Sequence, residues 1–512
     1  MHSMVLFCQK INQHSEINLR FPTTPQQKLG TTKIEDINFD IYSRHELVPI
    51  LMALQHLYVH CPDQLESILQ LVYKDVRPHQ NSHLGRIGMN CWESLVLAAV
   101  RLGCNMNFDG LADLATNHRK LRQMMMLSDW EEKRYSRSAI HDNFTLLSPE
   151  TIRAITAIVV EIGHGLGSKP LERVRADSFV VKKNIHYPTD TNLLYDGCRK
   201  IIELTKKIAV EFDIPGWRKN NFWKYTIKSS LRKITKIARS RAANRDQRLK
   251  EMYFYIIGQA QQLISKADGS LAILNEKVQS GEILLPKWQE VVSELQYFIA
   301  GTEHVIELAQ RRVFNDEKIP NPEKVFSLFE PDTELINRGK SPNPIEFGHR
   351  VLIVQDNAGF IIHDEVLGQG FTDEKVIADV MKRLQERFKG QIRAASFDKG
   401  FWTPNNLRDL SEFIPIVALP KKGRRSREDQ KRESNEEFGK IRKWHAGVES
   451  AIHALQAGNG LDLCRDKGAA GYQRYVAAAA LGRNLQVLGT ILLKKERKKR
   501  RKESDVLDIL LP

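Results

Sequence analysis

The chain has 512 residues, of which 42% are hydrophobic and 27% charged, and its formal net charge is +15. This length exceeds what one ordinary core can organise and predicts roughly two to four domains, while the composition excludes a wholly disordered chain. The positive charge favours a polyanionic partner, either nucleic acid or an anionic membrane surface.

The apolar and cysteine patterns exclude further classes of protein. The most apolar stretch, 475–493, is interrupted by Arg483, Asn484 and Gln486, so we expect no membrane span. The first 21 residues lack the apolar core of a signal peptide. The six cysteines form no CxxC pair, which argues against a zinc ribbon or a disulfide framework and favours a reducing cytoplasm. Nucleic acid is therefore the expected partner.

The first part of the chain divides into a polar arm and a helical region. Residues 1–42 are polar and mixed, and we expect a flexible arm there. From 43 to 165, apolar residues recur at helical spacing, and Ser148-Pro149 provides a helix start. Basic patches such as 118–122 would let this helical domain contact DNA; the alternative is a packing or dimerisation domain.

A strand-like segment and a long helical insertion come next. The apolar run 174–181 contains Asp177, and we place the insertion at about 200–320. Within it, residues 218–250 hold twelve Lys or Arg and one acid, Asp246. The apolar positions keep a helical period, so we expect a folded basic helix that contacts phosphates rather than a mobile charged segment. Its candidate DNA-binding residues are Arg232, Lys233 and Lys236.

From residue 348 the pattern alternates between strands and helices. Two strands flank a turn at 356–359, a helix covers 371–388, and a strand ends at Asp398. A short helix and a further strand follow. The remaining segments are a basic loop at 420–432, a long amphipathic helix carrying Glu449, an alanine-rich helix at about 470–493, and a basic tail at 494–512.

Three acids stand in settings that need an explanation: Asp177 in an apolar strand, Asp398 at the end of another, and Glu449 on the amphipathic helix. A carboxylate in an apolar element is costly unless it is paired, hydrogen-bonded or bound to a metal. The order of elements is typical of an RNase H-like α/β domain with a mixed central sheet, which we place at 171–490. In that arrangement the three carboxylates converge on two divalent cations.

Magnesium suits such a site, with Mn²⁺ as a substitute, because it takes few carboxylates and keeps positions for water and phosphate oxygens. Two such ions promote in-line displacement at phosphorus.

Each acid also has a structural interpretation. Asp177 could be a satisfied structural carboxylate, and Asp398 could be a turn residue. Exposed glutamates are common on helices, although Arg442 and His445 lie on the same edge as Glu449. Asp356 is the main rival as an active-site acid, but its Asp-Asn-Ala-Gly context makes it a turn former first. Weaker rivals are Asp190, Asp196, Glu436 and Glu437.

Five segments, taken together, resemble DDE transposases of bacterial insertion sequences, most closely the ISNCY type. They are Arg175-Ala176-Asp177-Ser178, Asn184-Ile185-His186-Tyr187-Pro188-Thr189-Asp190, Ser396-Phe397-Asp398-Lys399-Gly400-Phe401, Leu419-Pro420-Lys421-Lys422-Gly423 and His445-Ala446-Gly447-Val448-Glu449-Ser450. The region from Gly85 to Arg122 resembles the helical N-terminal domain of such enzymes.

The resemblance implies that Asp177, Asp398 and Glu449 form the catalytic, metal-binding triad of an endonuclease that cuts and joins double-stranded DNA. It further implies binding to terminal inverted repeats and target DNA, a homo-oligomer in the synaptic complex, and a bacterial cytoplasmic location at the nucleoid. Two alternatives share the sequence pattern: an RNase H-like nuclease without strand transfer, and a non-catalytic DNA-binding relative.

The chain also departs from the family pattern. Many related enzymes carry Tyr-x2-Arg-x3-Glu-x6-Lys around the last acid, where this sequence has Arg442, His445, Glu449 and Gln456. DNA contacts near the cleavage site would then come from Arg442 and His445. The insertion follows the first strand, whereas several related enzymes place theirs before the last helix.

Further DNA contacts are expected near the second acid. Trp402 could stack on an unpaired base, and a core aromatic is the alternative. The basic loop contributes Lys421, Lys422, Arg424 and Arg425.

Overall fold

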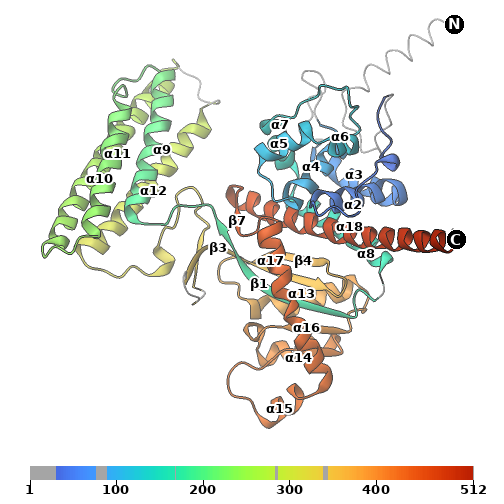
Figure 1. Ribbon diagram of the computed structural model, residues 1–512. Helices are drawn as coiled ribbons and strands as arrows, with labels where there is room; N and C mark the ends of the chain where they lie inside the picture. The colour runs from blue at the N-terminus through green and yellow to red at the C-terminus, as the bar shows by residue number, and fades with distance from the viewer. Residues whose placement is uncertain are drawn as a thin grey trace, which may run out of the picture. The chain divides into compact units, whose positions relative to one another are not determined.

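The computed structural model describes residues 30–510 apart from 77–88, 168, 283–285, 287, 338 and 340–343, and it does not describe the side chains of 504–510. Most of the expected arm, part of the Gly85–Arg122 resemblance and the last two residues of the tail therefore lie outside the described residues. The chain forms two units: a sheet unit, 1–182 with 348–512, and an insertion unit, 183–347 (Figure 1).

The fold is α/β with a mixed seven-stranded sheet, as expected. The strand order is β2-β3-β1-β5-β6, with β4 paired to β3 and β7 paired to β1. β1 is antiparallel to β3 and parallel to β5, which is parallel to β6. The strands are β1 Arg173–Lys183, β2 Glu334–Asn337, β3 Ile345–Asp356, β4 Ile361–Val366, β5 Ala394–Phe397, β6 Ile416–Ala418 and β7 Leu463–Cys464.

The predicted hairpin turn between β3 and β4 is confirmed, and Asp356 organises it. Its carboxylate accepts a hydrogen bond from the Phe360 backbone at 2.9 Å and lies 2.6 Å from His164 Nε2. The side chain is fully buried. Asp356 therefore has the structural role that its turn context predicted.

The predicted helical region at 43–165 is also confirmed, and Ser148 caps its last helix by accepting from Thr151 N. The arm extends less far than expected, because Ile34, Ile37 and Ile41 are buried against the helices. The elements are η2 Ile34–Asp36, α2 Leu47–His60, α3 Pro62–Val76, α4 Cys91–Gly103, α5 Phe108–Asn117, α6 Arg119–Met124, α7 Arg137–Leu146 and α8 Pro149–Leu166.

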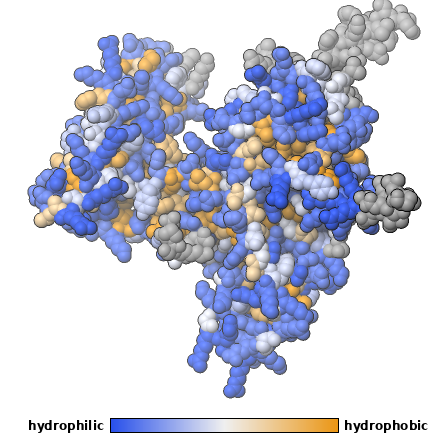
Figure 2. Space-filling view, in the orientation of Figure 1, coloured by the Kyte–Doolittle hydropathy of each residue, from blue (hydrophilic) through white to orange (hydrophobic). Residues whose placement is uncertain are grey.

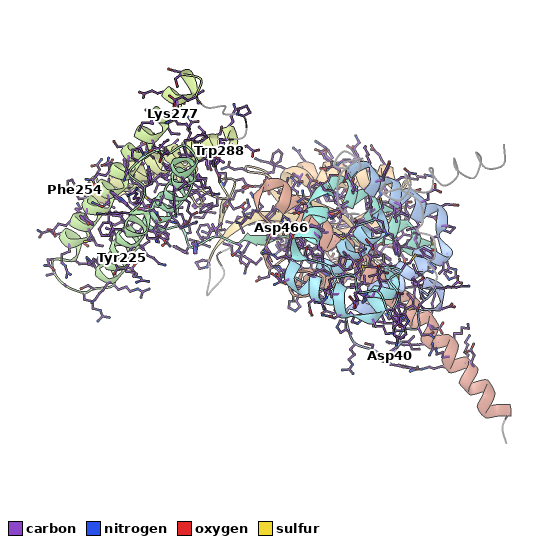
Figure 3. All side chains as sticks on the ribbon, turned by 90° about the horizontal axis from the view of Figure 1, so that it is seen from above. Asp40, Tyr225, Phe254, Lys277, Trp288 and Asp466 are labelled. Atoms are coloured by element: carbon purple, nitrogen blue, oxygen red, sulfur yellow. The ribbon has the colours of Figure 1, made fainter. Side chains whose placement is uncertain are left out.

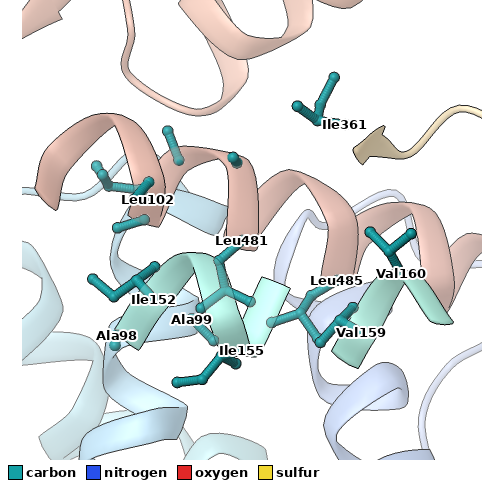
Figure 4. Close-up of a cluster of buried hydrophobic side chains, with 14 of the residues drawn as sticks. Ala98, Ala99, Leu102, Ile152, Ile155, Val159, Val160, Ile361, Leu481 and Leu485 are labelled. Carbon is teal, nitrogen blue, oxygen red and sulfur yellow. The ribbon is translucent and has the colours of Figure 1, made fainter. Parts of the chain in front are cut away.

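These helices do not form a core of their own. Figure 4 shows side chains of α4, α8, β4 and the C-terminal helix α18 (Gly468–Leu510) in one buried cluster. Arg101 of α4, 1% exposed, lies 3.8 Å from the centroid of the Phe108 ring and donates to Asp466 at 2.8 Å. A Cβ at Gly489 of α18 would lie 1.8 Å from the Pro49 carbonyl, so the backbones of α18 and α2 are in direct contact. The predicted boundary between a helical domain and a sheet domain is therefore absent.

Helix α18 joins the predicted alanine-rich helix and the predicted basic tail. By length and composition its segment Gly468–Glu503 could cross a membrane, but 67% of its apolar window is buried inside the protein, as in a core helix. The predicted basic tail continues this helix to Leu510. Lys and Arg are good helix formers, and Arg497 donates to the Ile41 carbonyl, which extends the packed part of the helix.

The C-terminal elements surround the end of the sheet. They are α13 Asp373–Arg387, η5 Lys399–Phe401, α14 Pro404–Phe413, α15 Arg427–Glu433, α16 Glu436–His445, α17 Gly447–His453 and a π-helical turn, η6 Ala454–Gly458. Two predictions are corrected here. The basic loop contains the helix α15, and the helix carrying Glu449 is broken between α16 and α17.

The insertion unit is a helical bundle with its own buried core. Its elements are α9 Asp190–Glu211, α10 Asn220–Ala238, α11 Arg245–Gln279, α12 Gln289–Phe314, η4 Asn321–Glu323 and β2. The predicted basic helix is α10, in which Ile227, Ile234 and Ile237 face the core. Hydrophilic residues cover most of the bundle face seen in Figure 2.

Candidate active site

The sheet register brings the first two acids together. β1 and β5 are parallel neighbours, and the last pair of that register is Ala176 with Phe397. The residue that follows this pair is Asp177 on β1 and Asp398 directly after β5, so the two acids are aligned where the β1–β5 pairing ends. Asp398 is exposed and caps η5 by accepting from Lys399 N. Asp177 is partly buried and accepts from Ser178 N at 2.8 Å.

Glu449 is exposed on α17, whose start is fixed by a residue of β1. The guanidinium of Arg175 donates to the Trp444 carbonyl at 2.8 Å, a group that a continuous helix would use internally. A Cβ at Gly447 would lie 2.2 Å from Arg175 Nη1, so only glycine leaves room for this side chain. A side chain inserted into the helical hydrogen bonds is a common cause of a break. Arg175 thereby holds the start of the Glu449 helix against the strand of Asp177.

Electrostatics connect all three acids. Burial raises the pKa of Asp177 to about 6, against the opposing effect of the Ser178 backbone hydrogen bond. The negative charges of Asp398, Asp373 and Glu449 add to this increase. Like charges raise a neighbour's pKa only when they are near it, so the three acids share one electrostatic neighbourhood.

Asp373, the first residue of α13, is a fourth carboxylate that the sequence analysis missed. Its side chain is 16% exposed, and its Oδ1 is buried without a hydrogen-bond partner among the described residues. Burial raises its pKa, which Ser178 and Arg350 oppose. A Cβ at Gly400, two residues after Asp398, would lie 4.0 Å from Asp373 Oδ2. In the sequence, Asp373 has the pattern of an ordinary first-turn acid of a helix, so only the fold identifies it.

The donor set matches a hard cation, since it consists of carboxylate oxygens only. Among the described residues, no three His, Cys, Asp or Glu side chains lie close enough to surround a metal ion. The carboxylates therefore share one electrostatic neighbourhood without converging on a common point. A cation would offset the repulsion that raises the pKa of Asp177.

Arg442 and His445 of α16, which were predicted to contact DNA, differ in exposure. His445 is 9% exposed, and its Nδ1 lies 3.0 Å from Ser396 Oγ on β5. Burial, followed by the charge of Arg442, lowers the pKa of His445 to about 4, so the ring is neutral at pH 7. This ring has little surface for DNA and instead fixes α16 to the sheet. Arg442 is partly exposed and donates weakly to the Phe397 carbonyl, at 3.4 Å.

Trp402 packs against the main core and is only partly buried. Its indole Nε1 is buried without a hydrogen-bond partner among the described residues, and the Lys421 ammonium lies 5.0 Å from its ring centroid. These contacts favour the core-aromatic interpretation over stacking on a base.

In the basic loop, two of the four cations predicted to contact DNA are neutralised by ion pairs. Lys421 pairs with Asp429 at 2.8 Å, and Arg425 pairs with Glu433 at 2.9 Å. Both acids belong to α15. Lys422 and Arg424 are exposed and form no ion pair with any residue that the structure describes.

Helix α10 presents a different surface. Arg232, Lys233 and Lys236 are exposed, and within the described ranges none of them has an ion-pair partner. Phe222, 64% exposed, and Tyr225, 70% exposed, lie about two to four turns before them on the same helix. In Figure 3, Tyr225 is labelled at the outside of the bundle. We call this surface, Phe222 to Lys236, the α10 stripe.

No protein-family model, curated protein or solved structure matches this chain. The site therefore has to be interpreted from its own geometry.

Proposed function

We propose that this protein is a DNA transposase with an RNase H-like catalytic domain, in which Asp177, Asp398 and Glu449 form a DDE triad. The observation that carries the proposal is the register of β1 and β5. Asp177, within β1, and Asp398, directly after β5, are the residues that follow the last β1–β5 pair, and the charge of Glu449 acts on the Asp177 carboxyl.

Asp177, Asp398 and Glu449 would hold Mg²⁺, or Mn²⁺ in its place, with Asp373 beside them. The bound ions would activate the attacking oxygen and stabilise the leaving oxygen during phosphoryl transfer. A cation would also offset the mutual repulsion of the four carboxylates, which adds to the cost of burying Asp177.

The chain's own residues position these groups. Arg175 fixes the start of the Glu449 helix, and the neutral His445 holds the preceding helix on β5 through Ser396. Arg442, Lys422 and Arg424 offer positive charge to the DNA backbone from the sheet unit. The α10 stripe offers a second set of charges from the insertion unit. DNA partners of this kind place the protein at the nucleoid, and bringing two DNA ends together requires an oligomer.

The test is a cleavage and joining assay on duplex DNA carrying the inverted repeats that flank the coding sequence. D177N, D398N and E449Q should each lower cleavage at least about 10³-fold in Mg²⁺, because groups that act as a unit fail together. End binding should persist. E437Q is the matched control, since Glu437 is an exposed acid on α16 outside the site.

Three outcomes separate the alternatives. Full cleavage by D398N would refute the triad. Cleavage without joining would indicate a nuclease that shares the same carboxylates. Salt-sensitive DNA binding by the wild type, with no cleavage in Mg²⁺ or Mn²⁺, would indicate a non-catalytic relative.

A further inference from the structure

A second charged site lies in the sheet unit, where the segment that enters α2, the turn η6 and helix α18 enclose a pocket of about 340 Å³. Its lining includes Arg44, Arg483, Lys494 and Arg497, with Glu46 as its acid. Counting only Arg, Lys and Glu, four cationic side chains against one carboxylate give the lining a net charge of +3. None of these residues belongs to the carboxylate site.

Arg483 is the most informative group in the pocket. It is partly buried within the apolar part of α18, and its Nε is buried without a hydrogen-bond partner among the described residues. Burial lowers its pKa, with no carboxylate acting in the opposite direction. A desolvated guanidinium without an anion is costly, since a buried charge needs a partner.

The neighbouring cations add to this cost. Arg44 and Lys494 are exposed, and neither forms an ion pair with a residue that the structure describes. Arg497 uses its Nε and one Nη on the Ile41 carbonyl, which leaves its other Nη available. An anion with several oxygens would satisfy these donors together, and the planar fork of arginine matches phosphate.

We propose that this pocket binds a phosphate group, held by Arg483 and Arg497 from α18 and by Arg44 and Lys494 at its rim. The pocket wall includes Ala454 of η6, five residues after Glu449, or roughly 7.5 Å along a helix. The ligand is either a backbone phosphate of DNA or a free phosphate such as that of a nucleotide.

The first experiment measures binding of inorganic phosphate to the full-length protein by calorimetry in EDTA, with NaCl adjusted to constant ionic strength. The wild type should bind phosphate, and R483Q should raise the dissociation constant about 10- to 100-fold, as expected for a lost charged hydrogen bond. The double variant R44Q/K494Q should also weaken phosphate binding, and it carries little risk to folding because both side chains are exposed. R501Q is the matched control, because Arg501 is exposed on α18 outside the pocket.

The second experiment distinguishes the two sources of phosphate by measuring duplex DNA binding in EDTA. If the ligand is a DNA backbone phosphate, R483Q and R44Q/K494Q weaken DNA binding, and free phosphate competes with DNA at constant ionic strength. If the ligand is a free phosphate, phosphate binding is lost in both variants while DNA affinity is unchanged.

Two results would overturn the proposal: wild-type protein that binds phosphate no better than chloride, or pocket variants that bind phosphate as the wild type does. Because neither experiment involves cleavage, D398N should respond like the wild type. Failure of the phosphate site is thus distinguishable from failure of the proposed triad.

Discussion

The basic loop of the sheet unit, 420–432, and the α10 stripe of the insertion unit differ in how their charges are paired. In the basic loop, Lys421 pairs with Asp429 and Arg425 pairs with Glu433. In the insertion unit, Arg232, Lys233 and Lys236 of the α10 stripe have no such partner within the described residues. Both regions are strongly basic in sequence, so net charge alone does not identify a nucleic-acid surface. A basic segment keeps its charge for nucleic acid only where the fold brings no acids close enough to pair with its cations.

The largest effect should come from removing the free charges. R232Q/K233Q/K236Q should weaken binding to duplex DNA on the order of 10²-fold at low salt and reduce the salt slope by up to about 2.7, since each phosphate contact contributes about 0.9. Fluorescence anisotropy over a salt series measures both. The control K206Q/K207Q/K318Q removes the same charge from other exposed positions of the unit. Equal losses in the two triple variants would show that net charge, not the stripe, drives binding.

Asp373, the fourth carboxylate, tests whether a charge of the sheet unit contributes to metal-dependent cleavage. D373N should raise the Mg²⁺ concentration needed for half-maximal cleavage about 10- to 100-fold without abolishing the reaction, as for other groups that tune a metal site. A Mg²⁺ titration of cleavage provides the measurement. D379N, an exposed acid on the same helix, should behave as the wild type. A wild-type Mg²⁺ response from D373N would remove Asp373 from the site.

Buried His445 should make the free energy of unfolding depend on pH. Its folded pKa of about 4 lies below the ordinary histidine value of about 6.5, so the unfolded chain binds the proton first as the pH falls. The free energy of unfolding should therefore fall by ~1–3 kcal/mol as the pH drops from about 6.5 to about 4, and this contribution should be constant above pH 6.5. Urea unfolding across this range should show a shallower pH dependence for H445N. An unchanged slope in that variant would assign the effect to other groups.

The smallest effect should come from the paired half of the basic loop. K421Q/R425Q removes two charges that Asp429 and Glu433 already neutralise, so DNA affinity should change less than about 2-fold and stability by less than about 1 kcal/mol. K422Q/R424Q removes the same charge from unpaired positions and should weaken DNA binding several-fold more. The same anisotropy assay compares the two. If K421Q/R425Q lost more DNA affinity than K422Q/R424Q, the ion pairs of Lys421 and Arg425 would have to open when DNA binds.

Much of the local structure could be predicted from the sequence. The strand of Asp177, the turn at Asp356, the strand before Asp398 and the amphipathic basic helix are all confirmed. These features depend on periodicity, turn chemistry and capping over a few residues. The predicted flexible arm was wrong at Ile34, Ile37 and Ile41, because isolated isoleucines in a polar segment reveal nothing about what they pack against.

The sequence by itself determined which kinds of element carry the three acids and where positive charge is concentrated, because both depend on local pattern. Only the tertiary structure decided that the charge of Asp373 acts on Asp177, that Arg175 reaches the break before the Glu449 helix, and that α18 packs with both the N-terminal helices and the sheet. It also decided which cations are neutralised and which remain free. These outcomes depend on contacts between residues far apart in the chain, which no local pattern records.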